Sequence, residues 1–376
     1  MITLKGKYNF AHVFTDNVDN TTQSQIIEML NQPAFKGTQI RIMPDCHAGK
    51  GSVIGFTAEL TDYIIPNIVG VDIGCAVYSW NLGNKIKLDY DVLDNLIKEK
   101  IPSGFKIREK KYNKDLLLKH FIENKLLDYI DFLNLSKEKV INSIGSLGGG
   151  NHFIEFGKDD NDDIWLTIHS GSRNFGLQVC NYFQNKAVKL KDKMLITGIP
   201  KGLEYLPRDF GGNEYLEGMK IAQELAHFNR TTMGYEIIEN LGAEVKDKVF
   251  SVHNYIDFED NIIRKGAIKA TEGTKVVIPF NMRDGLIIGT GKGSKKWNNS
   301  APHGAGRIMS RRQAKENIDL KDFKNSMEGI YSSCVKRSTL DESPFVYKDK
   351  DEILENIKET VDVDLFVKTL YNFKGN

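Results

Sequence analysis

The chain has 376 residues, of which 51 are Lys or Arg and 50 are Asp or Glu, and its formal net charge is +1. This balance excludes a strong overall attraction to nucleic acid or to an acidic partner, although a local basic cleft is compatible with it. The 4 cysteines lack the paired spacing of a disulfide framework, which indicates a reducing compartment. The N-terminus contains no apolar signal segment, and no apolar run approaches the roughly 18 residues that a membrane span needs. We therefore expect a cytoplasmic protein that does not enter a membrane.

Hydrophobic periodicity predicts β-rich and helical stretches that alternate along the chain. Apolar runs of strand length, separated by glycine turns, occupy residues 38–80, 164–172 and 248–291. Apolar residues at helical spacing occupy residues 87–142, 174–195 and 214–241. The C-terminal part is helical up to a final strand, expected within residues 361–376.

The candidate functional residues are spread from Asp72 to His303, and no repeat, low-complexity tract or linker divides the chain. Their segments must converge in a single fold if they form one site. We therefore expect one domain over residues 1–376, of the α/β (α+β) class, with helices packed on a central β-structure.

The segment VGVDIGC places Asp72 three residues before Cys75. In a strand these side chains would point to opposite faces, but Gly74 permits a turn that aims both at one ion. A lone cysteine is more often a buried apolar residue. The neighbouring aspartate and the separate histidines favour metal ligation instead.

Three further histidines lie where sites commonly gather. His152 follows three glycines in GSLGGGNHFIE, and His169 ends the apolar run IWLTIHSGS. His253 occupies a similar strand end in KVFSVHNYI. A single histidine in such a context is usually structural, whereas imidazole, thiolate and carboxylate groups together are typical ligands of a transition metal.

The segment APHGAGRIMSRRQAK carries the candidate for covalent chemistry. His303 precedes Gly304, Ala305 and Gly306, so its imidazole is uncrowded. A neutral imidazole nitrogen is a competent nucleophile toward phosphorus, and Arg307 and nearby arginines can stabilise the charge that develops. The alternative is a glycine-rich helix start with a solvated basic face.

The segment MPDCHAGKGSVIG lacks the spacing of a Walker phosphate-binding loop. Its polar residues Asp45, His47 and Lys50 are nevertheless set among glycines, and they are candidates for lining a cleft.

Together these segments resemble the RtcB family of RNA ligases. The resemblance runs in order through MPDCHAGKG, VGVDIGC, GSLGGGNHFIE, HSGSRNFG, HNY, RKGA, HGAGRIMSR, YKD and the terminal KG. It covers residues 43–375, nearly the whole chain. The resemblance implies a single α/β domain around a deep cleft that holds two Mn²⁺ ions, although ligand softness alone would favour Zn²⁺.

By this resemblance, Cys75 would bridge the two ions, His169 and His253 would complete one site, and Asp72 and His152 the other. His303 would attack the α-phosphate of GTP and carry GMP through a P–N bond. GMP would pass to an RNA 3′-phosphate, and a 5′-hydroxyl would displace it to seal the strand; a 2′,3′-cyclic phosphate would first be opened.

The resemblance also implies the contacts of the two substrates. The expected guanylate contacts are Asn151, His152, Phe153, Ile154, Glu155, His253, Asn254, Pro279, Phe280, Asn281, Met282, His303, Gly304, Ala305, Gly306 and Lys374. The expected RNA-phosphate contacts are Arg173, Lys265, Arg307 and Arg311. Archease is the protein partner that the family implies.

The chain departs from the family pattern at Ala76, which stands where glycine is usual, and at PFNMRDG, where Asn281 replaces a serine. Two other functions are compatible with the residues. One is a metal-dependent phosphohydrolase without a nucleotidyl intermediate, and the other is a non-catalytic RNA-binding homologue. The natural substrate, whether tRNA, damaged RNA or a DNA end, is left open by the sequence.

Overall fold

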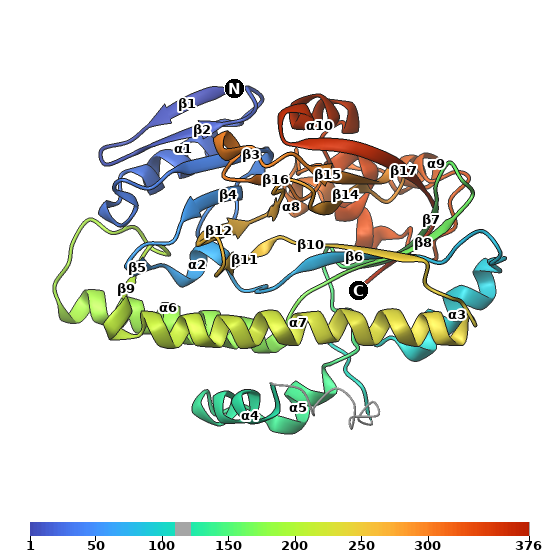
Figure 1. Ribbon diagram of the computed structural model, residues 1–376, viewed down its shortest axis with the longest axis horizontal. Helices are drawn as coiled ribbons and strands as arrows, with labels where there is room; N and C mark the ends of the chain where they lie inside the picture. The colour runs from blue at the N-terminus through green and yellow to red at the C-terminus, as the bar shows by residue number, and fades with distance from the viewer. Residues whose placement is uncertain (110–121, 376) are drawn as a thin grey trace.

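The computed structural model describes residues 1–109 and 122–375. It is a mixed structure in which two sheets lie over a layer of long helices (Figure 1). The expected class, with helices packed on a central β-structure, is confirmed. Part of the predicted helical stretch, residues 110–121, lies outside the described residues.

The first sheet has the order β1-β2-β3-β4-β12-β11. Its strands are β1 (Ile2–Lys5), β2 (Phe10–Val13), β3 (Ile40–His47), β4 (Ile54–Glu59), β12 (Ile262–Lys265) and β11 (Asn254–Asp257). Strands β2 and β3 pair in parallel, and the other neighbours are antiparallel.

The second sheet is antiparallel throughout, with the order β10-β6-β8-β7-β17-β15-β14. Its strands are β10 (Asp247–Val252), β6 (Ala76–Asn81), β8 (Ile164–Ser170), β7 (Phe153–Lys158), β17 (Val361–Lys374), β15 (Gly285–Gly291) and β14 (Lys275–Asn281). The two end strands approach each other, since the backbone N–H of Val277 on β14 donates to Ser251 Oγ on β10 at 2.9 Å. The second sheet is therefore nearly closed.

Two short pairs complete the β-structure: β5 (Tyr63–Ile64) with β9 (Leu206–Pro207), and β13 (Ala267–Lys269) with β16 (Ser300–Pro302). The α-helices are α1 (Asn20–Leu30), α2 (Pro66–Val69), α3 (Tyr90–Lys100), α4 (Ile122–Phe132), α5 (Lys137–Asn142), α6 (Arg173–Lys193), α7 (Gly212–Asn240), α8 (Arg311–Asn317), α9 (Leu320–Ser326) and α10 (Lys350–Asn356). The predicted strands and helices are confirmed within the described residues.

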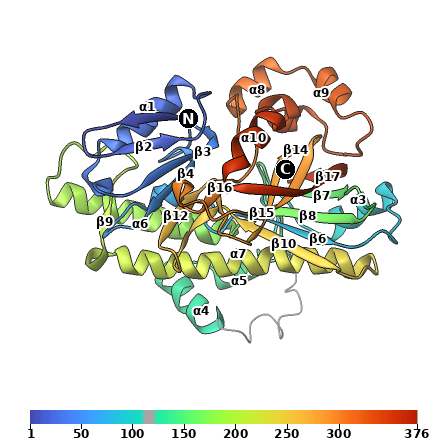
Figure 2. The same cartoon turned by 45° about the horizontal axis from the view of Figure 1, so that its top comes forward.

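Helices α6 and α7 run side by side beneath both sheets, and α4 packs on the far side of α7 (Figures 1 and 2). Because α7 has neighbours on several sides, it buries residues around its circumference, from Tyr215 to Ile238. Within residues 1–109 and 122–375, none of the helices combines the length and apolar character needed to cross a bilayer.

One face of the second sheet packs against helices, and the other lines a cavity. Successive side chains of a strand alternate between these two faces. On β7, Ile154 and Phe156 join the hydrophobic core that includes Met233 of α7. Phe153 and Glu155 point to the other face, into the interior of the nearly closed sheet, where they line a cavity. The alternation of β7 therefore separates a packing face from a functional face.

Candidate metal and nucleotide site

Four ligand candidates lie at one end of the second sheet. His253 directly follows β10, Cys75 directly precedes β6, His169 is in β8, and His152 directly precedes β7. These strands are consecutive antiparallel neighbours, so the end of one lies beside the start of the next. Sheet register therefore brings together four residues that are far apart in the sequence.

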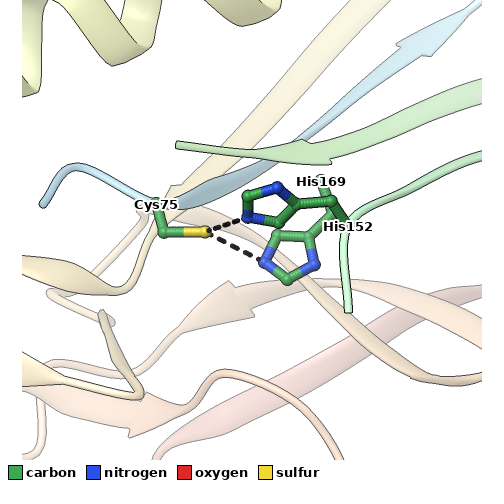
Figure 3. A group of neighbouring side chains, drawn as sticks. All are labelled: Cys75, His152 and His169. Carbon is green, nitrogen blue, oxygen red and sulfur yellow. Dashed lines mark hydrogen bonds between the residues drawn. The ribbon is translucent and has the colours of Figure 1, made fainter. Parts of the chain in front are cut away.

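The donor atoms of Cys75, His152 and His169 converge (Figure 3). Cys75 Sγ lies 3.1 Å from His169 Nε2 and 3.6 Å from His152 Nε2. His169 Nε2 lies 3.2 Å from His253 Nε2. All four residues are buried. Such a cluster of soft and borderline ligands is suited to a metal ion.

The backbone determines which ring nitrogens face the cluster. His152 Nδ1 lies 2.9 Å from Leu147 O, and His169 Nδ1 lies 3.2 Å from Asn151 O. A carbonyl oxygen only accepts, so each Nδ1 donates to it and each ring turns Nε2 toward Cys75. Burial lowers the pKa of His169 well below its ordinary value, which favours the neutral, metal-binding form. Converging lone pairs in a buried site are explained by a cation.

Asp72 approaches this group through the turn that the sequence predicted. Gly74 has a φ of +71°, and the Cys75 N–H donates to Asp72 O at 3.3 Å. Asp72 Oδ2 then lies 3.0 Å from His152 Nε2. Although burial opposes it, the charge and hydrogen bond of His152 lower the pKa of Asp72 to about 2. A carboxylate oxygen and a ring nitrogen that face each other at this separation are suited to share a cation.

His303 follows β16 and lies beside the metal-ligand candidates, its ring centroid 4.8 Å from that of His253. Its Nδ1 is 2.6 Å from Asp45 Oδ2, and its backbone N–H donates to the same oxygen at 3.2 Å. Asp45 is fully buried at the end of β3. Because the carboxylate accepts a hydrogen bond from Nδ1–H, the lone pair of His303 Nε2 is free to act as a nucleophile.

A cavity of about 780 Å³ adjoins this site. Among its lining residues are His47, Lys50, Arg307 and Arg311. It is also lined by these expected guanylate contacts: Asn151, Phe153, Glu155, His253, Pro279, Phe280, Asn281, Met282, His303, Gly304, Ala305, Gly306 and Lys374. This volume falls in the range of small-molecule and cofactor sites.

Comparison with known proteins agrees with this geometry. A family model described as "tRNA-splicing ligase RtcB" matches residues 25–375. The chain belongs to the RtcB family.

Named relatives of the RtcB family resemble this chain over most of their length. The RNA-splicing ligase RtcB of Escherichia coli K12 is 29% identical over 396 residues, which cover 95% of each chain. RNA-splicing ligase RtcB1 of another E. coli strain is 30% identical with the same coverage. The tRNA-splicing ligase RtcB of Nanoarchaeum equitans is 28% identical and covers 83% of each chain. Membership of the RtcB family supports an RNA ligase role and does not favour the phosphohydrolase or the non-catalytic alternative.

Three expected guanylate contacts lie behind the cavity wall. His152 belongs to the metal-ligand cluster described above. The side chain of Ile154 faces the core on the opposite side of β7, because it alternates with Phe153 and Glu155. Asn254 Oδ1 accepts from the Gly266 N–H at 3.0 Å and so holds β11 to the next turn.

Arg307 and Arg311 lie at the cavity and are joined to two acidic residues that sequence reasoning missed, Asp341 and Glu342. Arg307 Nη2 donates to Asp341 O at 2.7 Å, and Arg311 Nη1 lies 3.5 Å from Asp341 Oδ2. Glu342 Oε2 accepts from Lys374 Nζ at 3.2 Å. No local motif marks these acids, since their partners are remote in the sequence.

Arg173 and Lys265, the other expected RNA-phosphate contacts, do not line the cavity. Lys265 Nζ donates to the backbone carbonyl oxygens of Lys50, Ser52 and Asn67 at 2.7, 3.2 and 3.3 Å. Its burial lowers its pKa to about 7. Arg173 donates to Ser146 Oγ at 3.0 Å and to a backbone carbonyl at 2.8 Å. These contacts favour structural roles for both side chains.

Sequence reasoning also missed two buried polar residues of α7, Asn229 and Arg230. Arg230 Nη1 donates to Gly74 O at 2.7 Å and to Ser170 O at 2.6 Å, each adjacent to a metal-ligand candidate. Asn229 Nδ2 donates to Ser170 Oγ and Oδ1 accepts from the Gly145 N–H, at 3.1 and 2.8 Å. Charged and polar residues are frequent along α7, so no local signal marks these two. In this member of the RtcB family, hydrogen bonds from α7 therefore hold the segments that carry the metal-ligand candidates.

Proposed function

We propose that this protein is a GTP- and Mn²⁺-dependent ligase that joins an RNA 3′-phosphate or 2′,3′-cyclic phosphate to a 5′-hydroxyl through a histidine–GMP intermediate. The observation that carries the proposal is the position of His303. Its ring is held by Asp45 at the cavity wall and lies beside His253 of the ligand cluster. A phosphohydrolase would need the cluster but not an oriented, uncrowded nucleophile.

The ligand cluster fits divalent cations. Asp72, Cys75, His152, His169 and His253 would hold them, and His253 Nδ1 is a buried atom without a hydrogen-bond partner among the described residues. When bound, two such ions neutralise the triphosphate and favour in-line phosphoryl transfer.

The first step is attack by His303 Nε2 on the α-phosphorus of GTP. A P–N bond forms, the bond to the bridging oxygen breaks, and pyrophosphate leaves with the electron pair. Positive charge develops on the imidazole, and the Asp45 carboxylate at 2.6 Å from Nδ1 stabilises it. Asp45 therefore orients His303 and supports the transition state.

The later steps transfer and release GMP. An oxygen of the RNA 3′-phosphate attacks phosphorus, the P–N bond breaks, and His303 Nε2 regains its lone pair. The 5′-hydroxyl then loses its proton and its oxygen attacks the activated 3′-phosphate. The phosphorus–oxygen bond to GMP breaks, and GMP leaves with the electron pair. Guanylylation converts the 3′-phosphate oxygen, a poor leaving group, into a better one.

RNA binding is assigned to the cations at the cavity. Arg307 and Arg311 lie on its lining, and the side chain of Arg311 is about half exposed. Local placement of these charges reconciles a nucleic-acid substrate with a net charge of +1. Archease is the proposed protein partner, and the cytoplasm the proposed location.

The test is incubation of the purified protein with α-labelled GTP and Mn²⁺, followed by a denaturing gel. We expect label that survives denaturation, is lost in acid, and is absent from His303→Ala. His227→Ala, which removes an exposed histidine of α7, is the matched control and should retain the label. Intact Mn²⁺ binding without label, with and without archease, would contradict the nucleotidyl mechanism.

A further inference from the structure

Asn372 lies on the cavity-facing side of β17, directly opposite Glu155 of β7 in the antiparallel register. Its Nδ2 donates to Glu155 Oε2 at 2.7 Å. The neighbours Tyr371 and Phe373 point to the hydrophobic core, whereas Asn372 and Lys374 line the cavity. The strand backbone therefore holds the amide and the carboxylate side by side on the cavity wall.

The other amide atom of Asn372 is unpartnered. Asn372 is 1% exposed, and its Oδ1 is buried without a hydrogen-bond partner among the described residues. Because Nδ2 donates to Glu155 Oε2, the amide oxygen Oδ1 is turned away from that carboxyl group. A buried amide oxygen without a donor is unfavourable, and few such atoms occur in native structures. A donor on a bound ligand would satisfy it.

The hydrogen-bonding groups on this part of the cavity wall limit which ligands can bind there. Glu155 and Asn372 present adjacent acceptors, and Lys374 Nζ is a cationic donor held 5.0 Å above the ring of Phe153. Guanine offers an N1–H and two N–H bonds on its 2-amino group. A carboxylate can accept from N1–H and from one N–H of the amino group, which leaves the second amino N–H for another acceptor. Adenine has neither the N1–H nor the 2-amino group.

Asn281, from the segment that departs from the family pattern, is already engaged in its own turn. Its Oδ1 accepts from the backbone N–H groups of Arg283 and Asp284 at 2.9 and 3.0 Å. Its Nδ2 donates to Asp284 Oδ2 at 2.7 Å. The acceptor capacity of Asn281 is therefore used inside the hairpin, whereas Oδ1 of Asn372 has no hydrogen-bond partner among the described residues.

We propose that Asn372 is a guanine-specificity residue, whose Oδ1 accepts a hydrogen bond from the 2-amino group of a base held by Glu155. This assignment rests on the proposed function, because it takes the cavity as the GTP site. It names a residue of this chain that selects guanine over bases without a 2-amino group.

The experiment compares GTP with ITP, whose base has the N1–H but lacks the 2-amino group. The measured quantity is kcat/KM for labelling of His303 in the presence of Mn²⁺. We expect the unaltered protein to prefer GTP by about 10- to 100-fold, the usual effect of a buried polar group left unpaired. In Asn372→Leu the GTP-to-ITP ratio should fall by about tenfold or more, mostly through loss of activity with GTP.

Labelling with ITP serves as the folding control within the same variant, and Asn240→Leu, an exposed position at the end of α7, is the matched substitution. An unchanged ratio in Asn372→Leu would overturn the assignment, including the case in which both activities fall equally because Asn372 only positions Glu155. Absence of label from the unaltered protein with either nucleotide would overturn the proposed function as well. The two failures are therefore distinguishable.

Discussion

Asp45 and His303, which are 258 positions apart in the sequence, are joined by a hydrogen bond of 2.6 Å between Oδ2 and Nδ1. The carboxylate is fully buried, and it also accepts from the His303 backbone N–H. This double contact fixes both the backbone and the ring of the nucleophile. The free ring nitrogen is consequently presented to the cavity before any substrate binds.

Asp45→Asn should reduce the rate of histidine–GMP formation by at least about 100-fold, because an amide can donate to Nδ1 and so favour the wrong tautomer. Mn²⁺ binding should be retained, since Asp45 is not among the proposed ligands. Single-turnover labelling at saturating GTP is the measurement. Asp16→Asn, at an exposed position, is the control, and an undiminished rate in Asp45→Asn would exclude the orienting role.

Metal binding should release protons. Burial raises the pKa of the Cys75 thiol well above its ordinary value, so in the absence of metal the thiol is protonated at neutral pH. A coordinating thiolate must lose that proton, and Mn²⁺ affinity should therefore fall by about tenfold for each unit of decreasing pH per proton released. Calorimetric titration in buffers of different ionisation enthalpy measures this number. Cys75→Ala should release roughly one proton fewer, and equal release in both proteins would contradict ligation by Cys75.

Glu155 should make stability depend on pH. Burial raises its pKa to about 7 from the ordinary value of 4.5, despite the opposing effects of Asn372 and Lys374. Between these values the folded protein retains a proton that the unfolded chain has lost, so the free energy of unfolding falls as pH rises. The contribution is up to about 3 kcal/mol, lost progressively between pH 4.5 and 7.

Urea unfolding of the unaltered protein and Glu155→Gln at several pH values isolates this effect. The difference in unfolding free energy between the two proteins should shift in favour of Glu155→Gln as pH rises through this range. A difference that stays constant with pH would show that Glu155 titrates normally.

Arg230→Met should destabilise the protein by about 2–4 kcal/mol, because it leaves the buried carbonyls of Gly74 and Ser170 without their donor. Mn²⁺ affinity should fall as well, since these carbonyls belong to the turn before Cys75 and the residue after His169. Denaturant unfolding and metal titration are the measurements. Arg312→Met, at an exposed position of α8, should change neither quantity.

The sequence by itself determined much of this protein, because the relevant information is local. Apolar runs predicted the strands of the second sheet except β7, and helical spacing predicted α6 and α7. Glycines beside His152, His169 and Cys75 marked the strand ends where ligands gather, and the glycine-rich segment after His303 marked the candidate nucleophile. The resemblance to the RtcB family, carried by these short motifs, was confirmed by the family comparison.

Tertiary structure decided which polar groups meet. The partners of His303 and Lys374, namely Asp45 and Glu342, are distant in sequence, and the pairing of Asn372 with Glu155 follows from the β7–β17 register. Register also turned Ile154 away from the cavity. Backbone carbonyls bind the ammonium group of Lys265, which the resemblance had assigned to RNA phosphate. Periodicity specifies an element and its faces, whereas the partner of each face depends on long-range packing that no local pattern contains.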